Sequence, residues 1–245
     1  MRKKDKLRGS ILVLMLAVLA AGIFPAAAAN GKRDLPIYAV GRDDNVVSLS
    51  FDAAWGNEDT EQLIEILGKY GIHATFFVVG EWVDKYPESV KALHDAGHEI
   101  MNHSDSHPHF TQLSPEKMAA EVKACSDKIE AVTGVRPHLF RPPYGDYNDA
   151  VVSTLRNEGY YTIQWDVDSL DWKNPGSDAI TKRVLEKTVS GSILLFHNAA
   201  EQTPAALPAI IEGLQAKGFT FAPISQLIYQ ENYEIDHAGV QQKKK

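Results

Sequence analysis

Short apolar runs alternate with longer amphipathic segments from residue 46 to about residue 229. The apolar runs are rich in β-branched residues and nearly continuous, as is typical of parallel strands covered on both faces. The amphipathic segments carry helix signals at their ends, such as Ser114-Pro115 at a start and Gly71 at an end. We therefore expect strands at residues 46–51, 72–79, 98–101, 138–140, 160–167, 192–196 and 219–222, with helices between them.

This alternation predicts an α/β protein with a parallel sheet. Seven strand–helix repeats are most economically closed as a distorted (β/α)7-type barrel. A chain of 245 residues with 44% hydrophobic residues suits one such domain. We expect residues 45–230 to form the single domain, residues 30–44 a linker, and residues 231–245 a disordered tail.

The first 29 residues have the layout of a signal peptide. Five basic residues precede an apolar run at residues 11–24, and four alanines follow at 26–29. The apolar run is short for a membrane-spanning helix, so we expect cleavage and export. An uncleaved N-terminal membrane anchor is the alternative. The protein is then expected to be secreted, or to act at the outer face of the cytoplasmic membrane or in the cell wall.

Charge and cysteine content exclude some functions. The formal net charge is −7, and no basic stripe exists outside the N-terminal segment and Lys243–Lys245, which argues against nucleic acid as a partner. A neutral polymer suits such a surface better, and we expect a monomer. Cys125 is the only cysteine and recurs at helical spacing with Val122 and Ile129, so we expect it in the core and not as a nucleophile.

Five polar clusters each follow the end of an apolar run. In α/β barrels the carboxyl ends of the strands open onto one face, so these clusters are expected to converge there. Histidines, carboxylates and an arginine together are typical of a metal-assisted hydrolase. The clusters are Phe51-Asp52, His103-Ser104-Asp105-Ser106-His107, Arg141-Pro142-Pro143-Tyr144, Asp168-Ser169-Leu170-Asp171-Trp172 and Leu195-Phe196-His197.

The first two clusters suggest a metal site beside a base. His103 and His107 are four residues apart, so one helical turn would place both on one side, ready to share a metal. Asp52 at a strand end could act as a general base that activates water. Two polar loop residues and a turn aspartate are the alternatives that the sequence leaves open.

The other clusters suggest groups that assist a base and an acid. Arg141 could hold a carboxylate ionised and oriented, or form an ordinary salt bridge. His197 could donate a proton to a leaving amine, with Asp168 accepting its other ring N–H, or be a core histidine. Trp172 could wall a small acyl pocket, or belong to the barrel core.

Taken together and in this order, the clusters resemble the polysaccharide deacetylase (NodB-homology) domain of carbohydrate esterase family four, over residues 45–228. The resemblance implies a distorted (β/α) barrel that removes acetyl groups from glycans with one divalent metal, usually zinc. Residues 51–56, 141–147 and 164–176 are further similar to the sporulation-associated PdaB-type branch. That similarity implies peptidoglycan of the cell wall or spore cortex as the target, with acetate released from its amino sugars.

The resemblance also assigns roles to nine residues. Asp52 matches the general base and Arg141 the residue that orients it; His103 and His107 match the metal ligands; the Tyr144 backbone N–H matches an oxyanion donor; Asp168 and His197 match the acid pair; Trp172 and Leu195 shape the acetyl pocket.

Ala53 departs from the family pattern. Two adjacent aspartates are expected there, the second being the carboxylate ligand of the metal, and alanine has no ligand atom. Metal binding should therefore be weaker, unless extra waters fill the coordination sphere or Asp52 itself binds the metal and is then compromised as a base. The sequence thus predicts a metal-dependent deacetylase, with a non-catalytic glycan-binding or morphogenetic protein as the alternative.

Overall fold

The structure is a computed structural model that describes residues 33–244. A curled sheet of seven parallel strands lies at its centre, in the order β6–β5–β4–β3–β2–β8–β7. The strands are β2 (Val46–Ala53), β3 (Thr75–Val78), β4 (Glu99–Asn102), β5 (Leu139–Phe140), β6 (Tyr161–Thr162), β7 (Val167–Asp168) and β8 (Ile193–His197), and β9 (Thr220–Phe221) pairs with the start of β2. The predicted α/β barrel of one domain is confirmed, in the form of a half-barrel.

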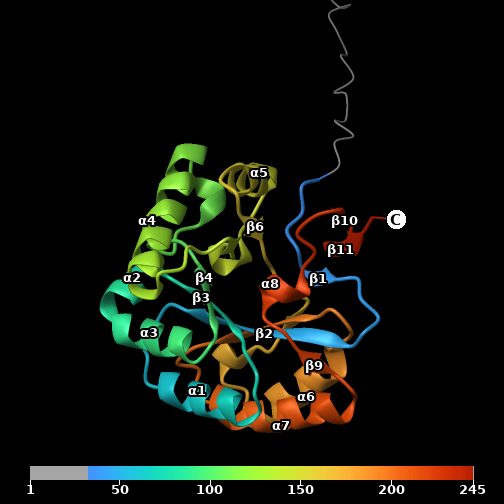
Figure 1. The fold of residues 1–245 in the computed structure, drawn as a ribbon. Coiled ribbons are helices and arrows are strands. Elements are labelled where there is room, and N and C mark those ends of the chain that lie inside the picture. The colour runs from blue at the N-terminus through green and yellow to red at the C-terminus, as the bar shows by residue number, and fades with distance from the viewer. Residues whose placement is uncertain (1–32, 245) are drawn as a thin grey trace, which may run out of the picture. The chain divides into compact units, whose positions relative to one another are not determined.

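Helices cover the outside of this sheet. They are α1 (Thr60–Lys69), α2 (Gly80–Lys85), α3 (Pro87–Asp95), α4 (Pro115–Thr133), α5 (Asp149–Asn157), α6 (Ser177–Lys187) and α7 (Thr203–Ala216). The short α8 (Ile224–Leu227) instead packs against the inner face, with Phe77 and Met101. Figure 1 shows α1, α6 and α7 side by side along one edge and α2 to α5 along another. The sequence did not predict α2, because its six residues are too few to show a helical period.

Helix α4 shows how the sequence determines these elements. The Ser114 hydroxyl accepts a hydrogen bond from the Lys117 N–H at the start, and Gly134 ends the helix with φ of 74°. Met118, Val122 and Cys125 lie buried on its inner face. Cys125 is thus confirmed as a core residue, and burial raises the pKa of its thiol.

The prediction of one strand at residues 160–167 is wrong. β6 and β7 lie at the two ends of the sheet order, so residues 163–166 cross from one edge to the other. In this bridging segment, Ile163 pairs with Ile37, and the Trp165 ring lies 5.6 Å from the Arg141 guanidinium. Ile163 and Gln164 are buried as strand residues would be, but residues 163–166 do not form a strand.

The predicted linker and disordered tail contain a second, three-stranded sheet. β1 (Ala39–Val40) pairs in parallel with β11 (Val240–Lys243), which pairs antiparallel with β10 (Tyr233–Ile235). The prediction of disorder is therefore wrong for residues 233–243. The sequence does not predict this sheet because the buried residue of β11 is polar. Gln241 is fully buried and forms two hydrogen bonds of 2.7 Å with the backbone of Tyr229. The predicted signal peptide at residues 1–29 lies outside the described residues.

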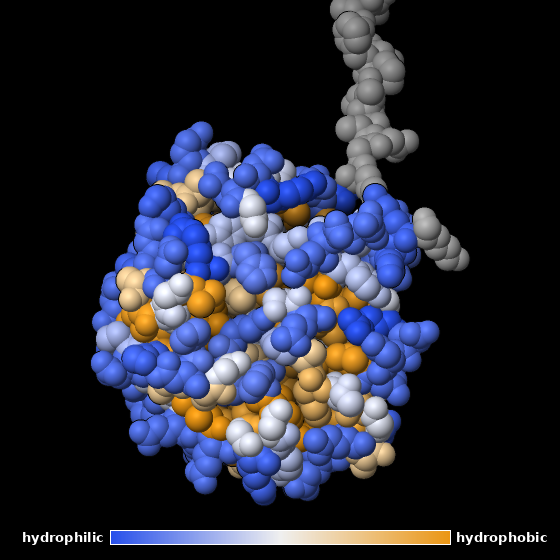
Figure 2. Space-filling model, viewed as in Figure 1, coloured by the Kyte–Doolittle hydropathy of each residue, from blue (hydrophilic) through white to orange (hydrophobic). Residues whose placement is uncertain are grey.

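Apolar side chains are concentrated inside the domain. Three stacked rings join β2, β3 and β8. The Phe51 ring centroid lies 4.8 Å from that of Phe76 and 5.5 Å from that of Phe196. On the face in Figure 2, hydrophilic side chains surround separate patches of hydrophobic ones. Within residues 33–244, no helix is long and apolar enough to cross a membrane.

The substitution Gln241→Ala should lower the free energy of unfolding by about 2 kcal/mol, because it removes the hydrogen-bond partners of the partly buried Tyr229 N–H and C=O. Urea denaturation of both proteins measures the difference. Gln242→Ala is the matched control, since the hydrogen bond it removes is 3.4 Å long. Equal stability of the Gln241→Ala protein and the wild type would show that these two hydrogen bonds contribute nothing to stability.

Candidate active site

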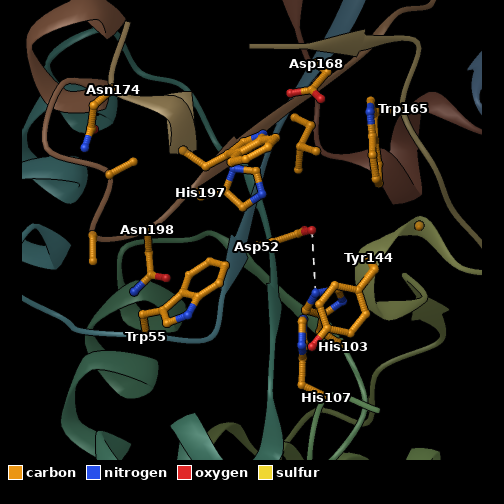
Figure 3. A pocket seen from close by; sticks show the side chains of 15 residues that line it. Asp52, Trp55, His103, His107, Tyr144, Trp165, Asp168, Asn174, His197 and Asn198 are labelled. Carbon is orange, nitrogen blue, oxygen red and sulfur yellow. Dashed lines mark ion pairs between the residues drawn. The ribbon is translucent and has the colours of Figure 1, made fainter. Parts of the chain in front are cut away.

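A pocket of about 600 Å³ lies at the carboxyl ends of the strands. Residues from all five polar clusters line it, so the structure brings together segments that are far apart in the sequence. Figure 3 shows His103, His107 and Tyr144 on one side of Asp52 and His197 on the other. The lining residues are Asp52, Trp55, His103, His107, Tyr144, Gly145, Trp165, Asp168, Trp172, Asn174, Leu195, His197, Asn198, Ala199 and Ala200.

Asp52, near the end of β2, forms a buried ion pair with Arg141. The Arg141 Nη1 donates to Asp52 Oδ1 at 2.7 Å, and Nη2 donates to the Ser50 hydroxyl at 2.8 Å. Burial raises the pKa of the Asp52 carboxyl, but Arg141 and nearby imidazoles outweigh this and hold that pKa below its usual range. Asp52 is therefore ionised, and its second oxygen remains available as a base.

His103 and His107 lie close together, with ring centroids 4.9 Å apart. The expected helical turn is wrong, because Ser104 and His107 have φ of 71° and 58° and form an irregular loop. His103 Nδ1 lies 2.8 Å from the Arg141 carbonyl, which can only accept, so Nδ1 carries the proton and Nε2 a lone pair. Burial lowers the pKa of both imidazoles, that of His107 to about 4, and keeps them neutral.

Neutral imidazoles with a free lone pair suit a divalent cation such as zinc. His103 Nε2 lies 3.6 Å from Asp52 Oδ2, so a carboxylate oxygen stands beside this donor. Ala53 occupies the position where the family pattern has a ligand, and it is fully buried in the apolar core. Among the residues that the structure describes, no group of three or more His, Cys, Asp or Glu has the geometry of a metal site. The side chains suited to hold a cation here are therefore the two imidazoles of His103 and His107.

Tyr144 lies in a tight turn after β5, with φ of 60°. Its ring packs against the imidazoles of His107 and His109, with centroids 4.5 and 4.3 Å away. Within residues 33–244, its backbone N–H donates to no other group. This N–H can therefore serve a ligand in the pocket, as the resemblance predicts.

His197, at the end of β8, is paired with Asp171 and not with Asp168 as predicted. Its Nδ1 lies 2.8 Å from Asp171 Oδ1, and its backbone N–H donates to Asp171 Oδ2 at 2.8 Å. The Asp168 carboxylate instead accepts the Leu170 N–H. The left-handed Leu170, with φ of 58°, turns the chain back so that Asp171 reaches His197.

Asp171 also determines how readily His197 takes up a proton. Burial lowers the pKa of His197, but the hydrogen bond and charge of Asp171 outweigh this and raise it. Asp171 is fully buried and accepts another hydrogen bond from the Thr203 hydroxyl at 2.6 Å. Sequence spacing offered no means of choosing between the two aspartates of this cluster.

The walls of the pocket include both predicted and unpredicted residues. Leu195 is buried and Trp172 exposed, and both face the pocket as expected. Trp55, Trp165 and Asn198 are additional. Asn198 accepts the Ala54 N–H at 3.2 Å and donates to the Gly56 carbonyl, so it holds the loop that carries Trp55. The Trp55 ring lies 6.0 Å from that of His197. Trp55 and Trp165 lie in segments quoted above for their similarity to the PdaB-type branch, but no role was assigned to them; the only signal for Asn198 was its nearness to a strand end.

A family model described as polysaccharide deacetylase matches residues 39–163, about half of the chain. The chain belongs to the polysaccharide deacetylase family. It is 35% identical over 196 residues to a peptidoglycan-N-acetylglucosamine deacetylase of Bacillus cereus and spans 92% of it. It is 33% identical to YlxY of Bacillus subtilis, an uncharacterized protein, and 36% identical to the peptidoglycan-N-acetylmuramic acid deacetylase PdaC of that organism. It spans 60% and 39% of those two longer relatives.

Solved structures agree with this family assignment. BA3943 of Bacillus anthracis, described as a carbohydrate esterase family 4 pseudoenzyme, is 35% identical with a TM-score of 0.76. The match covers 78% of this chain and 68% of BA3943. A BA3943 mutant described as having restored enzymatic activity matches with the same TM-score and 36% identity, over 78% of this chain and 70% of the mutant.

The substitution Asp171→Asn should lower the pKa of His197, because burial then acts without the opposing charge. NMR titration of the His197 ring protons measures this. Any acid-catalysed step that needs protonated His197 would lose rate at a lower pH than in the wild type. Asp168→Asn is the matched control and should lower the pKa of His197 by less. A decrease as large as that in Asp171→Asn, or larger, would show that Asp168 is the partner of His197.

Proposed function

We propose that this chain is a metal-dependent deacetylase that hydrolyses N-acetyl groups on peptidoglycan amino sugars and releases acetate. The observation that carries the proposal is that one pocket holds both an ionised carboxylate and an imidazole with a raised pKa. Asp52 is kept ionised by Arg141, and His197 is kept basic by Asp171. Amide hydrolysis needs both a base for water and an acid for the leaving amine.

The residues of the chain divide this reaction between them. Asp52 Oδ2 takes a proton from the attacking water, while Arg141 keeps the other carboxylate oxygen in place. The water oxygen bonds to the acetyl carbon, and the Tyr144 N–H stabilises the negative charge on the carbonyl oxygen. Protonated His197 then gives its Nε2 proton to the nitrogen as the carbon–nitrogen bond breaks. The products are acetate and a free amine.

His103 and His107 would hold the metal ion in this scheme. A bound divalent cation supplies Lewis acidity that polarises the acetyl carbonyl. The His103 ring is fixed by its hydrogen bond to the Arg141 carbonyl, so the same arginine orients both the base and one imidazole ligand.

The rim of the pocket supports a glycan as substrate. Trp55, Tyr144 and Trp172 are 55–62% exposed, and all three line the pocket. Exposed aromatic rings gathered at one opening mark a binding surface, since their flat apolar faces can pack against sugar rings. The names of the Bacillus relatives support peptidoglycan as this glycan.

We also propose that the protein works outside the cytoplasmic membrane, in sporulation, and as a monomer. The basic and apolar layout of residues 1–29 supports export, with the uncleaved segment as a possible membrane attachment. The similarity of residues 51–56, 141–147 and 164–176 to the PdaB-type branch supports the sporulation role.

Ala53 favours a second candidate, a non-catalytic glycan-binding protein on the same fold. It removes the carboxylate ligand that the family pattern expects, and a protein similar to this chain is described as a pseudoenzyme. In that case the aromatic rim would bind peptidoglycan and the imidazoles would have no catalytic role.

Zinc titration of the chelator-stripped domain, residues 30–245, should separate the two candidates. We expect binding that is lost in His103→Ala and strengthened about tenfold or more in Ala53→Asp, because the number of protein ligands increases. Acetate release from peptidoglycan should be abolished in Asp52→Asn. If the wild type neither binds zinc nor releases acetate while Ala53→Asp does both, the binding protein is the better description.

The substitution Trp55→Ala should weaken binding of an N-acetylglucosamine tetramer about fivefold, since a stacked aromatic ring contributes roughly 1 kcal/mol. Calorimetry with the Asp52→Asn background avoids turnover during the measurement. Val189→Ala, which trims an exposed apolar side chain outside the pocket lining, is the control. Unchanged affinity in Trp55→Ala would exclude this ring from the glycan site.

A further inference from the structure

The loop that carries the two histidines has a shape that its own residues do not favour. Ser104 and His107 both have left-handed backbones, with φ of 71° and 58°. Residues other than glycine adopt this conformation rarely, and it persists where surrounding contacts determine it. Residues 103–107, the two-histidine loop, have one internal hydrogen bond, from the His107 N–H to the Ser104 hydroxyl, and the other hydrogen bonds of the loop come from outside it.

Glu121 on α4 supplies the most concentrated set of these contacts. Its Oε2 accepts the backbone N–H groups of Asp105 at 3.0 Å and Ser106 at 2.9 Å, and its Oε1 accepts the Ser106 hydroxyl at 2.8 Å. Hydrogen bonds to an ionised carboxylate are stronger than those between neutral groups. One side chain thus satisfies three donors at the middle of the two-histidine loop.

The same side of α4 makes further contacts with this region. Lys128, seven residues after Glu121 and so on the same helix face, pairs with Asp105 and Asp84 at 2.7 Å each. The Asn102 side chain, just before the loop, donates to the Ser126 hydroxyl at 2.8 Å. Of these contacts, those of Glu121 reach closest to His107, because Glu121 bonds Ser106, the residue just before it.

The two imidazoles differ in how they are held. The His103 ring is fixed by its hydrogen bond to the Arg141 carbonyl. Within residues 33–244, neither ring nitrogen of His107 has a hydrogen-bond partner, and only its backbone N–H is bonded, to the Ser104 hydroxyl. The place of the His107 ring therefore depends on its backbone and on packing against Tyr144 and His103.

We propose that Glu121 is a positioning residue that sets the place of the His107 imidazole relative to His103 by anchoring the two-histidine loop. It contacts neither ring and acts through the backbone of residues 105 and 106. The consequence for metal binding rests on the function proposed above, because the distance between the two imidazoles has to be fixed only if both bind one cation.

NMR on Glu121→Ala and Glu121→Gln tests the anchor without a metal. In Glu121→Ala, we expect the amide protons of Asp105 and Ser106 to exchange about tenfold faster or more, and the proton contacts between the His107 and Tyr144 rings to weaken. Glu121→Gln keeps one acceptor oxygen and should lie between this variant and the wild type. Glu130→Ala removes an exposed carboxylate from the same helix and should change neither quantity.

Zinc titration of the same variants, made in the Ala53→Asp background, tests the consequence. We expect affinity about tenfold lower in Glu121→Ala and unchanged in Glu130→Ala. Unchanged ring contacts would overturn the positioning role, and lost contacts with unchanged zinc affinity would overturn its consequence for metal binding. If the Ala53→Asp protein itself binds no zinc, the proposed metal dependence fails, and the ring contacts alone decide whether Glu121 positions His107.

Discussion

A fully buried arginine is the constraint on which the rest of the site depends. Burying a guanidinium is costly unless it is paired, and removing the partner of a buried pair typically costs about 3–5 kcal/mol. Arg141 meets this requirement with Asp52 and Ser50 of β2 and the Gln164 carbonyl of the bridging segment, and its guanidinium lies 4.2 Å from the Phe77 ring of β3. Its own backbone carbonyl orients His103. One residue thus links the half-barrel, its open side and the His103 imidazole.

The pocket gives one residue type two opposite properties. His103 and His107 are neutral because burial lowers the pKa of each ring more than the charge of Asp52 raises it, whereas burial of His197 is outweighed by the carboxylate of Asp171. A neutral ring can act as a ligand and a protonated ring as an acid. Where the surroundings give groups of one type different pKa values, those groups can take different roles in a site.

Local signals in the sequence were enough to predict most of the fold. Strand runs, the Ser114-Pro115 start and the Gly134 end of α4 are decided by neighbours within a few residues. The convergence of five clusters followed from the geometry of parallel sheets. The choice between Asp168 and Asp171, and the irregular loop before His107, depend on contacts from distant segments, so no spacing rule could supply them.

The pairing of β1 with β11 has a consequence for the order in which the chain folds. Residues 39 and 40 find their strand partners at residues 240 and 241, about two hundred positions later. A chain that emerges from the ribosome amino end first can form β2, β3 and β4 from nearby residues, but β1 can pair with β11 only after residues 240 and 241 have emerged. Contacts so distant in sequence slow folding, because a long loop has to close before they form. Completion of this small sheet therefore depends on residues that emerge long after the central strands have paired.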